Sequence, residues 1–188
     1  YPNFHVLQQN IRFFIRNNVR GIFEQGCGDM PGSEFAELRA FLLARLLWDA
    51  DADPDALMNE FLAVFYGPSA EPVRAYIDLF RDHVLDSGIH IHMACTANRT
   101  HFPDEVLDRA EALLAEAERL AGDGEIRSRV RRLALSLKYV RLCHIPKNSP
   151  HKRTAAEAFY AEAAALGVPS SREGWDAARC IDYITDHG

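Results

Sequence analysis

The chain has 188 residues, of which 48% are hydrophobic and 26% are charged, and this composition is typical of a folded globular domain with its own core. The formal net charge of −6 argues against sequence-independent binding to nucleic acid, which requires a positive surface. The longest apolar stretch, residues 41–48, contains Arg45 and is far shorter than the roughly 20 residues that cross a bilayer, so we expect no membrane partner.

The first 48 residues combine helical and strand-like patterns. Apolar side chains at three- and four-residue spacings predict a helix over residues 4–18, and a second apolar helix is expected over 33–48. Between them, the run VRGIF at 19–23 is typical of a short buried strand that ends at the carboxylate of Glu24. A loop with glycines at 26, 28 and 32 follows. The sequence therefore predicts one strand in an otherwise helical chain.

The rest of the chain is expected to be helical apart from residues 87–103, where the pattern favours a short extended segment or an ordered loop. Asp53 before Pro54 is a strong helix start, and Ser69, Pro103, Ser149 and Ser171 are interpreted as further helix starts. At least two thirds of the ordered chain should be helical. Helices are predicted over approximately 54–66, 70–86, 103–120, 125–142, 150–166 and 171–184.

A lone strand cannot satisfy its own backbone donors and acceptors, so its partners must lie elsewhere. The chain begins at Tyr1 with neither an initiator methionine nor a signal-peptide pattern, and we expect a cut point within a longer protein. The order helix, strand, glycine-rich loop and helix is that of the last unit of a (β/α)8-type barrel. We therefore predict a mainly α fold, with residues 1–50 as a terminal barrel unit and residues 51–188 as a C-terminal helical domain.

An apolar patch is expected where the upstream barrel of the same polypeptide would pack. Its predicted members come from the first helix, the strand and the second helix: Ile11, Phe14, Ile22 and Leu42. The same patch would support self-association of the isolated chain.

Three segments carry a resemblance to a known family: NFHVLQQNIRFFIRNNVRGIFEQG at 3–26, the stretch from GSEFAELRAFLLARLLWDAD to AYIDLF at 32–80, and VRRLALSLKYVRL at 130–142. They are similar to the C-terminal part of a bacterial family carried as a domain of unknown function. Its full-length members resemble glycoside hydrolases of the α-glucuronidase and β-hexosaminidase kind. The resemblance implies a carbohydrate partner and the C-terminal segment of a carbohydrate-active barrel protein. Two alternatives stay open: a non-catalytic carbohydrate-binding or scaffolding protein on this fold, and an independent helical interaction module.

Glu24 and Gln25 are the predicted substrate-binding residues, because side chains at the C-terminal end of a barrel strand face the ligand site. The alternative for Glu24 is a structural acid that caps the following loop. Glycoside hydrolysis needs two carboxyl groups across the scissile bond. We expect that catalytic pair upstream of this chain, and the chain alone to be inactive. Asp29 and Glu34 are candidates for a second carboxylate, but we interpret them as helix-capping or solvated acids.

No metal or other cofactor is predicted. His90 and His92 form a His-x-His pair, and His101 could supply a third zinc ligand only if the loop folded back, so we interpret all three as hydrogen-bonding or pocket-lining histidines. The cysteines are widely spaced, without a Cys-x-x-Cys pair, and are expected to be small buried residues. Core packing is expected for three large aromatic residues: Trp48, Tyr66 and Trp175.

Overall fold

The computed structural model describes residues 3–24, 33–89 and 97–187, and 72% of these residues are helical, which confirms the mainly α prediction. None of the helices in these ranges has the length and apolar content to span a bilayer. In chain order the elements are η1 (Phe4–Val6), α1 (Leu7–Arg16), α2 (Ala36–Trp48), α3 (Pro54–Tyr66), η2 (Gly67–Ser69), α4 (Ala70–Ser87), α5 (Asp104–Leu120), α6 (Glu125–His144), α7 (Lys152–Ala165) and α8 (Ala177–His187).

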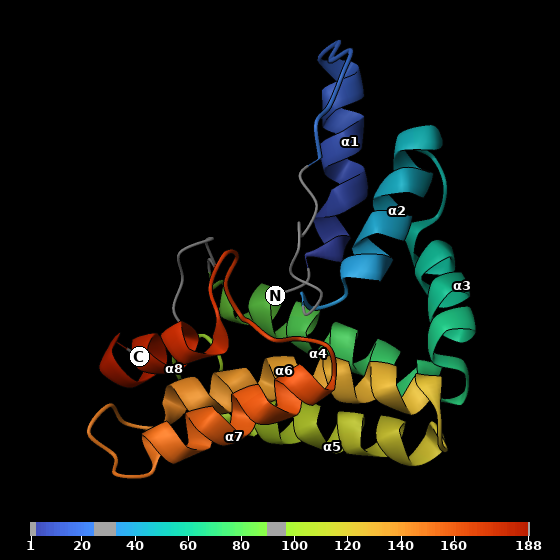
Figure 1. The fold of residues 1–188 in the computed structure, drawn as a ribbon. Coiled ribbons are helices and arrows are strands. Elements are labelled where there is room, and N and C mark those ends of the chain that lie inside the picture. Colours follow the sequence, from blue (N-terminus) through green and yellow to red (C-terminus); the bar gives the residue numbers. More distant parts are fainter. Residues whose placement is uncertain (1–2, 25–32, 90–96, 188) are drawn as a thin grey trace.

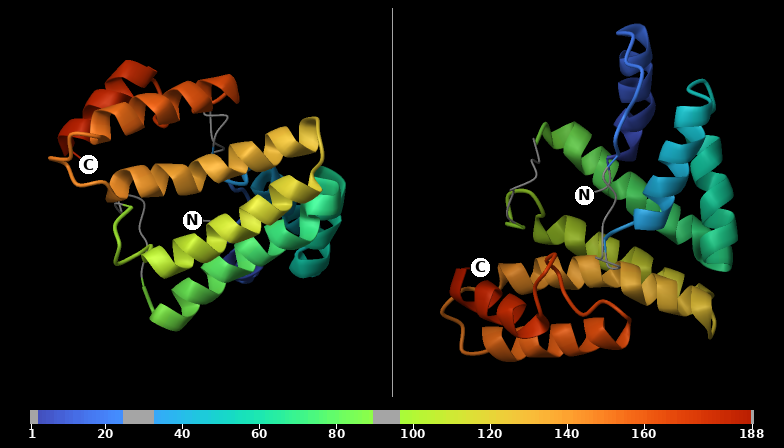
Figure 2. Two further views of the ribbon diagram at one scale, coloured as in Figure 1. Left: turned by 90° about the horizontal axis from the view of Figure 1, so that it is seen from below. Right: turned by 45° about the horizontal axis from the view of Figure 1, so that its top comes forward.

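The helices form two groups. In Figure 1, α4, α5, α6 and α7 run across the lower part of the view, while α1, α2 and α3 stand above them at a steep angle. Figure 2 shows the same arrangement from two other directions, with α8 lying against α7. From α2 onward each helix packs on the next one in the sequence. The fold is therefore a chain of neighbouring helices rather than a bundle around one axis.

The hydrophobic core has one large part and two small ones. The large cluster contains leucines of α2 together with side chains of α3, α4, α5 and α6, so it takes residues from both sides of position 50. Two small clusters lie between α6 and the C-terminal segment, one around Leu135 and Ala163 and the other around Leu142, Ala156 and Ile184. The division into residues 1–50 and 51–188 stays a prediction.

Two helix starts illustrate what local sequence determines. The Asp53 carboxylate accepts hydrogen bonds from the backbone amides of Asp55 at 2.9 Å and Ala56 at 3.3 Å, as predicted for the cap of α3. Ser69 was expected to cap α4 in the same way, and this expectation is wrong. Its buried hydroxyl donates instead to the carbonyl of Ala117 in α5, at 2.6 Å. A tertiary hydrogen bond has replaced the local one.

The C-terminal helix also begins later than expected. Ser171 was predicted to open it, but α8 starts at Ala177. The carboxylate of Asp176 accepts from the Arg179 amide at 2.8 Å at that point, so Asp176 supplies the cap. The Ser171 hydroxyl is instead hydrogen-bonded to the hydroxyl of Tyr160, at 2.6 Å.

The strand predicted at residues 19–24 does not form. These residues lie outside every helix, and no strand occurs in the described part of the chain. The amide of Val19 still donates to the carbonyl of Phe14 at 3.1 Å, at the end of α1. A strand needs a neighbour for its backbone donors and acceptors, and the described residues supply none.

Only part of the predicted apolar patch lies at the surface: Ile22 is exposed and Phe14 is half-buried. Ile11 and Leu42 are buried, because α1 packs on α2 and the side chains of Leu7 and Ile11 belong to the large core cluster. Leu47 and Trp48 of α2, Val64 of α3 and Leu85 of α4 are exposed, and one further exposed apolar stretch lies at the far end of α1 and in the segment after it. Its members are Phe13, Ile15, Val19, Ile22 and Phe23, and Phe23 is 89% exposed.

Candidate functional site

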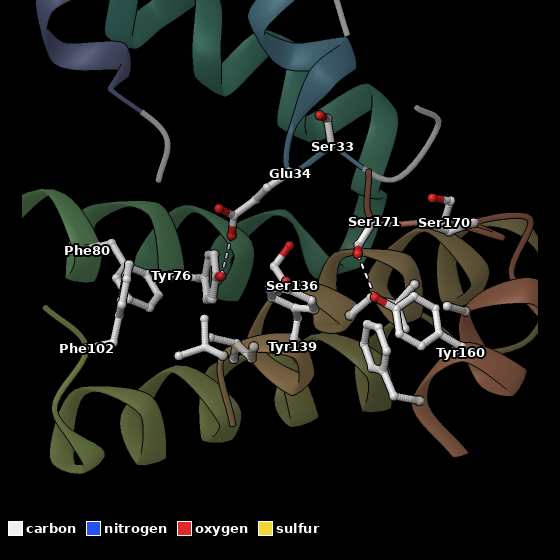
Figure 3. A pocket seen from close by; sticks show the side chains of 16 residues that line it. Ser33, Glu34, Tyr76, Phe80, Phe102, Ser136, Tyr139, Tyr160, Ser170 and Ser171 are labelled. Carbon is white, nitrogen blue, oxygen red and sulfur yellow. Dashed lines mark hydrogen bonds between the residues drawn. The ribbon is translucent and has the colours of Figure 1, made fainter. Parts of the chain in front are cut away.

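A pocket of about 570 Å³ lies between α4, α6 and α7 and is closed by the residues just before α2 and by residues 168–171 (Figure 3). Its size is that of an ordinary small-molecule site. The lining side chains fall into three kinds: aromatic (Tyr76, Phe80, Phe102, Tyr139, Phe159, Tyr160), polar (Ser33, Glu34, Ser136, Ser170, Ser171) and aliphatic (Leu135, Leu137, Val140, Ala163, Val168).

The aromatic side chains form two groups at opposite ends of the pocket, as Figure 3 shows. Tyr76, Phe80 and Phe102 form a chain of edge-on contacts, with ring centroids 5.1 and 6.1 Å apart. At the other end, Phe159 contacts Tyr139 at 5.8 Å and Tyr160 at 5.0 Å. These rings pack on one another, which limits the rotation of each. The pocket therefore has firm, mostly apolar walls.

Several polar groups of the pocket are held by specific partners. The hydroxyl of Tyr76 donates to the carboxylate of Glu34, and the hydroxyls of Tyr160 and Ser171 are bonded at 2.6 Å. Burial, and then the negative charge of Glu34, raise the pKa of Tyr76 well above its ordinary value, so Tyr76 stays a neutral donor. Among the described residues that line the pocket, Glu34 alone carries a charge.

An unusual backbone conformation places Glu34. The next residue, Phe35, has φ +54° and ψ +36°, which is the left-handed region that bulky residues rarely adopt. The Phe35 side chain is buried and contacts the rings of Phe4 and Tyr76, each at a centroid distance of 6.0 Å. This packing holds the strained backbone, and the strained backbone turns the chain so that Glu34 meets Tyr76. Strain of this kind is often found at binding sites.

Glu24, which was predicted from sequence to bind substrate, is not among the described residues that line this pocket. Glu24 is exposed at the end of the segment that follows α1, and its predicted role remains a prediction. Gln25, Asp29, His90 and His92 lie outside the described residues. Glu34 was interpreted as a capping or solvated acid; the structure instead makes it a pocket residue bonded to Tyr76.

His101 belongs to a small hydrogen-bonded turn. Its backbone carbonyl accepts from the ring Nε2 of His83 at 3.0 Å, and its amide donates to the side chain of Asn98 at 3.0 Å. Within the described part of the chain, no group of three or more histidine, cysteine or acidic residues is arranged to hold a metal ion.

The remaining aromatic and cysteine predictions have mixed outcomes. Tyr66 is buried in the main core, as expected, but Trp48 is 92% exposed at the end of α2, so its predicted core position is wrong. Trp175 is half-buried, with the guanidinium groups of two arginines and the ring of Tyr183 around it. Cys180 is buried, as expected, and Cys143 is only half-buried, while Cys27 and Cys95 lie outside the described residues.

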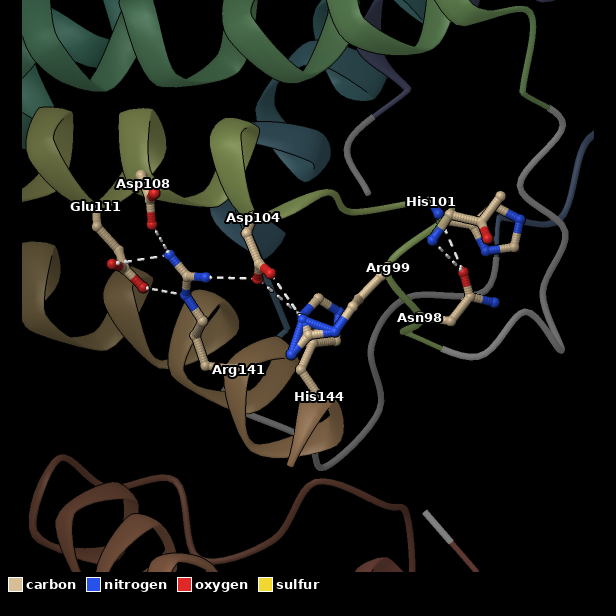
Figure 4. A network of polar contacts seen from close by, with 9 residues as sticks. Asn98, Arg99, His101, Asp104, Asp108, Glu111, Arg141 and His144 are labelled. Carbon is tan, nitrogen blue, oxygen red and sulfur yellow. Dashed lines mark hydrogen bonds and ion pairs between the residues drawn. The ribbon is translucent and has the colours of Figure 1, made fainter. Parts of the chain in front are cut away.

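A second polar cluster joins α5 to α6 (Figure 4). Arg141 donates to Asp104 at 2.9 Å, to Glu111 at 2.7 Å and to Asp108, and the carboxylates of Glu111 and Asp108 raise its pKa. The ring Nδ1 of His144 lies 3.5 Å from the carboxylate of Asp104. Arginine and acids thus satisfy one another, so we interpret this cluster as a cross-link between helices rather than a ligand site.

Titration of the tyrosines provides a test of this packing. Burial raises the pKa of Tyr139 to about 12 and also raises the pKa values of Tyr66, Tyr76 and Tyr160. An unfolded chain loses these protons near pH 10. The contribution of these buried, neutral tyrosines to the free energy of unfolding is therefore complete below pH 10. It is lost as the pH rises toward the pKa values of the folded chain.

We expect the melting temperature to fall steeply above pH 10, with most of the phenolate absorbance appearing only as the chain unfolds. Tyr139→Phe should make the fall shallower. Ionisation of all these tyrosines at pH 10 in a chain that remains helical by circular dichroism would contradict the packing described here.

Comparison with known proteins finds a family similarity in the first part of this helical chain, over less than half of its length. Residues 1–78 match the model of a family described as a domain of unknown function (DUF4838). No curated protein and no solved structure matches the chain. The match covers η1, α1, α2, α3 and the first half of α4, and it includes Glu34 and Tyr76 of the pocket.

Proposed function

We propose that this chain is the C-terminal segment of a carbohydrate-active, glycoside hydrolase-like protein and is not catalytic by itself. In this proposal residues 1–50 complete a (β/α)8-type barrel, and residues 51–188 form a helical domain that supports it. Sugar binding by Glu24 and Gln25 at the mouth of that barrel is part of the same proposal.

The exposed apolar segment after α1 is the observation that carries this proposal. Val19, Ile22 and Phe23 are exposed, and residues 19–24 have strand-like sequence without a strand partner among the described residues. Large apolar side chains gathered on one surface mark a place where another part of a protein packs. Pairing with an upstream barrel strand would bury these side chains and satisfy the backbone groups together.

Hydrogen exchange on the complete gene product and on the 188-residue chain tests the proposal. We expect the amides of residues 20–24 to exchange slowly in the complete protein and quickly in the chain, because only a paired strand protects them. The amides of α5 and α6 are the control and should be protected in both. Equally fast exchange of residues 20–24 in both proteins would overturn the proposal and favour an independent helical interaction module.

Glu24→Gln in the complete protein tests the role of the acid. The substitution keeps the size and removes the charge, so a ligand-facing Glu24 should lose sugar affinity or turnover with little change in melting temperature. A lower melting temperature with unchanged binding would make Glu24 a structural acid. The 188-residue chain should hydrolyse no glycoside, because it supplies at most one of the two required carboxyl groups.

A further inference from the structure

We propose that the 570 Å³ pocket binds an uncharged sugar ring and discriminates against the corresponding uronate. This inference rests on the proposed carbohydrate function and deepens it. It assigns a second sugar site to the helical part of the chain, away from Glu24, and it specifies the charge of the sugar.

The walls of the pocket suit a ring with apolar faces. Of the aromatic side chains that line the pocket, Phe102, Tyr139 and Phe159 are half-buried and can present ring surface to a ligand, while Tyr76, Phe80 and Tyr160 are almost fully buried. A pyranose ring has C–H groups on its faces and hydroxyls around its edge. Its faces can displace water from aromatic side chains while its edge still needs polar partners.

Polar partners are present between the two aromatic groups. The carboxylate of Glu34 accepts hydrogen bonds only, and its position is set by the Tyr76 hydroxyl. The Ser136 hydroxyl points toward the same space in Figure 3, and it makes no hydrogen bond to another described residue. A hydroxyl both donates and accepts. Glu34 and Ser136 together can therefore bind neighbouring sugar hydroxyls.

The charge of the lining sets the preference between neutral and acidic sugars. No lysine, arginine or histidine belongs to the lining in the described part of the chain, and Glu34 is negative. Arg129 and Arg132 line an adjacent smaller pocket that also includes Glu34 and Glu37, and they donate to the carbonyls of Phe65 and Leu166. Arg172 follows the lining residue Ser171, but its guanidinium lies over the rings of Trp175 and Tyr183. The carboxylate of a uronate would lose its hydration, would have no cationic side chain of the lining to pair with and would be repelled by Glu34. The uronate should therefore bind more weakly than the neutral sugar.

Nuclear magnetic resonance titration with methyl β-glucoside and methyl β-glucuronide tests the proposal, because the two probes differ only in the charged group at C6. We expect the glucoside to shift the amides of Ser136 and Ser171 with a dissociation constant in the millimolar range, and the glucuronide to bind roughly fivefold more weakly. Equal binding of both sugars, or no shift with either up to about 50 mM, would overturn the proposal.

Two pairs of variants locate the binding. Ser136→Phe should fill the pocket and abolish the shifts, whereas Ser128→Phe, at a half-buried position of the same helix outside the pocket, should leave them unchanged. Glu34→Gln, which keeps the volume, should remove most of the roughly fivefold discrimination, whereas Glu37→Gln should preserve it. Binding that survives Ser136→Phe, or discrimination that survives Glu34→Gln, would contradict this assignment.

The two proposals can fail separately. Protected amides at residues 20–24 in the complete protein, together with no sugar binding in this pocket, would leave the proposed function standing and remove the second site. Sugar binding here with unprotected amides would support the pocket and overturn the barrel.

Discussion

Replacing Leu38 with alanine is expected to lower the free energy of unfolding by about 3–4 kcal/mol. Leu38 is fully buried in α2, inside the large core cluster that α2 shares with α3 and α4. The substitution removes buried apolar atoms and leaves a cavity that surrounding helices can fill only in part. Urea unfolding followed by circular dichroism measures the loss.

Leu85→Ala is the matched control, because the same atoms are removed from a side chain of α4 that is largely exposed. It should change the free energy of unfolding by no more than about 0.5 kcal/mol. Similar losses in both variants would mean that α2 does not pack as described.

Gly67→Ala is expected to destabilise the chain by about 1–3 kcal/mol. Gly67 connects α3 to η2 with φ +50° and ψ −122°, a conformation that is nearly restricted to glycine. A Cβ atom here would also lie 2.9 Å from Cδ1 of Ile126, in the first turn of α6. Backbone strain and a steric clash therefore act in the same direction, and the strain is the larger part because the Ile126 side chain can move.

Two further variants separate these causes by thermal unfolding. Ile126→Val removes Cδ1, so the double variant should recover part, but not all, of the stability lost in Gly67→Ala. Gly122 also has positive φ, but a Cβ atom added there would meet no other atom within 4 Å. Gly122→Ala should therefore show the effect of backbone strain alone. Complete recovery in the double variant would assign the whole effect to the clash.

The helices could be predicted because each depends on a pattern repeated over many neighbouring residues. The Asp53 cap was predictable for the same reason, since its hydrogen-bond partners are two and three residues away. The strand and the Ser69 cap failed where the outcome depends on a distant partner. The hydroxyl of Ser69 finds a carbonyl 48 residues along the chain, and residues 19–24 lack a partner among the described residues.

The pocket was missed for the same physical reason. Glu34 and Tyr76 are 42 residues apart, and in sequence Glu34 looks like any acid in the first turn of a helix. The helical spacing of Tyr76 predicts a core residue, and its ring is buried in the core. Its hydroxyl nevertheless reaches the pocket. The positive φ of Phe35 turns Glu34 toward Tyr76. The sequence does not indicate it, because phenylalanine rarely adopts positive φ.

The packing of each helix on its neighbour in sequence has a consequence for how the chain opens. Contacts that are local along the chain allow fast folding, because little loop entropy is lost before they form. The two small C-terminal clusters are separate from the main core, so α7 and α8 can unfold locally while the rest stays folded. Tyr160 and Ser171 would move with them, and the pocket would widen through that fluctuation.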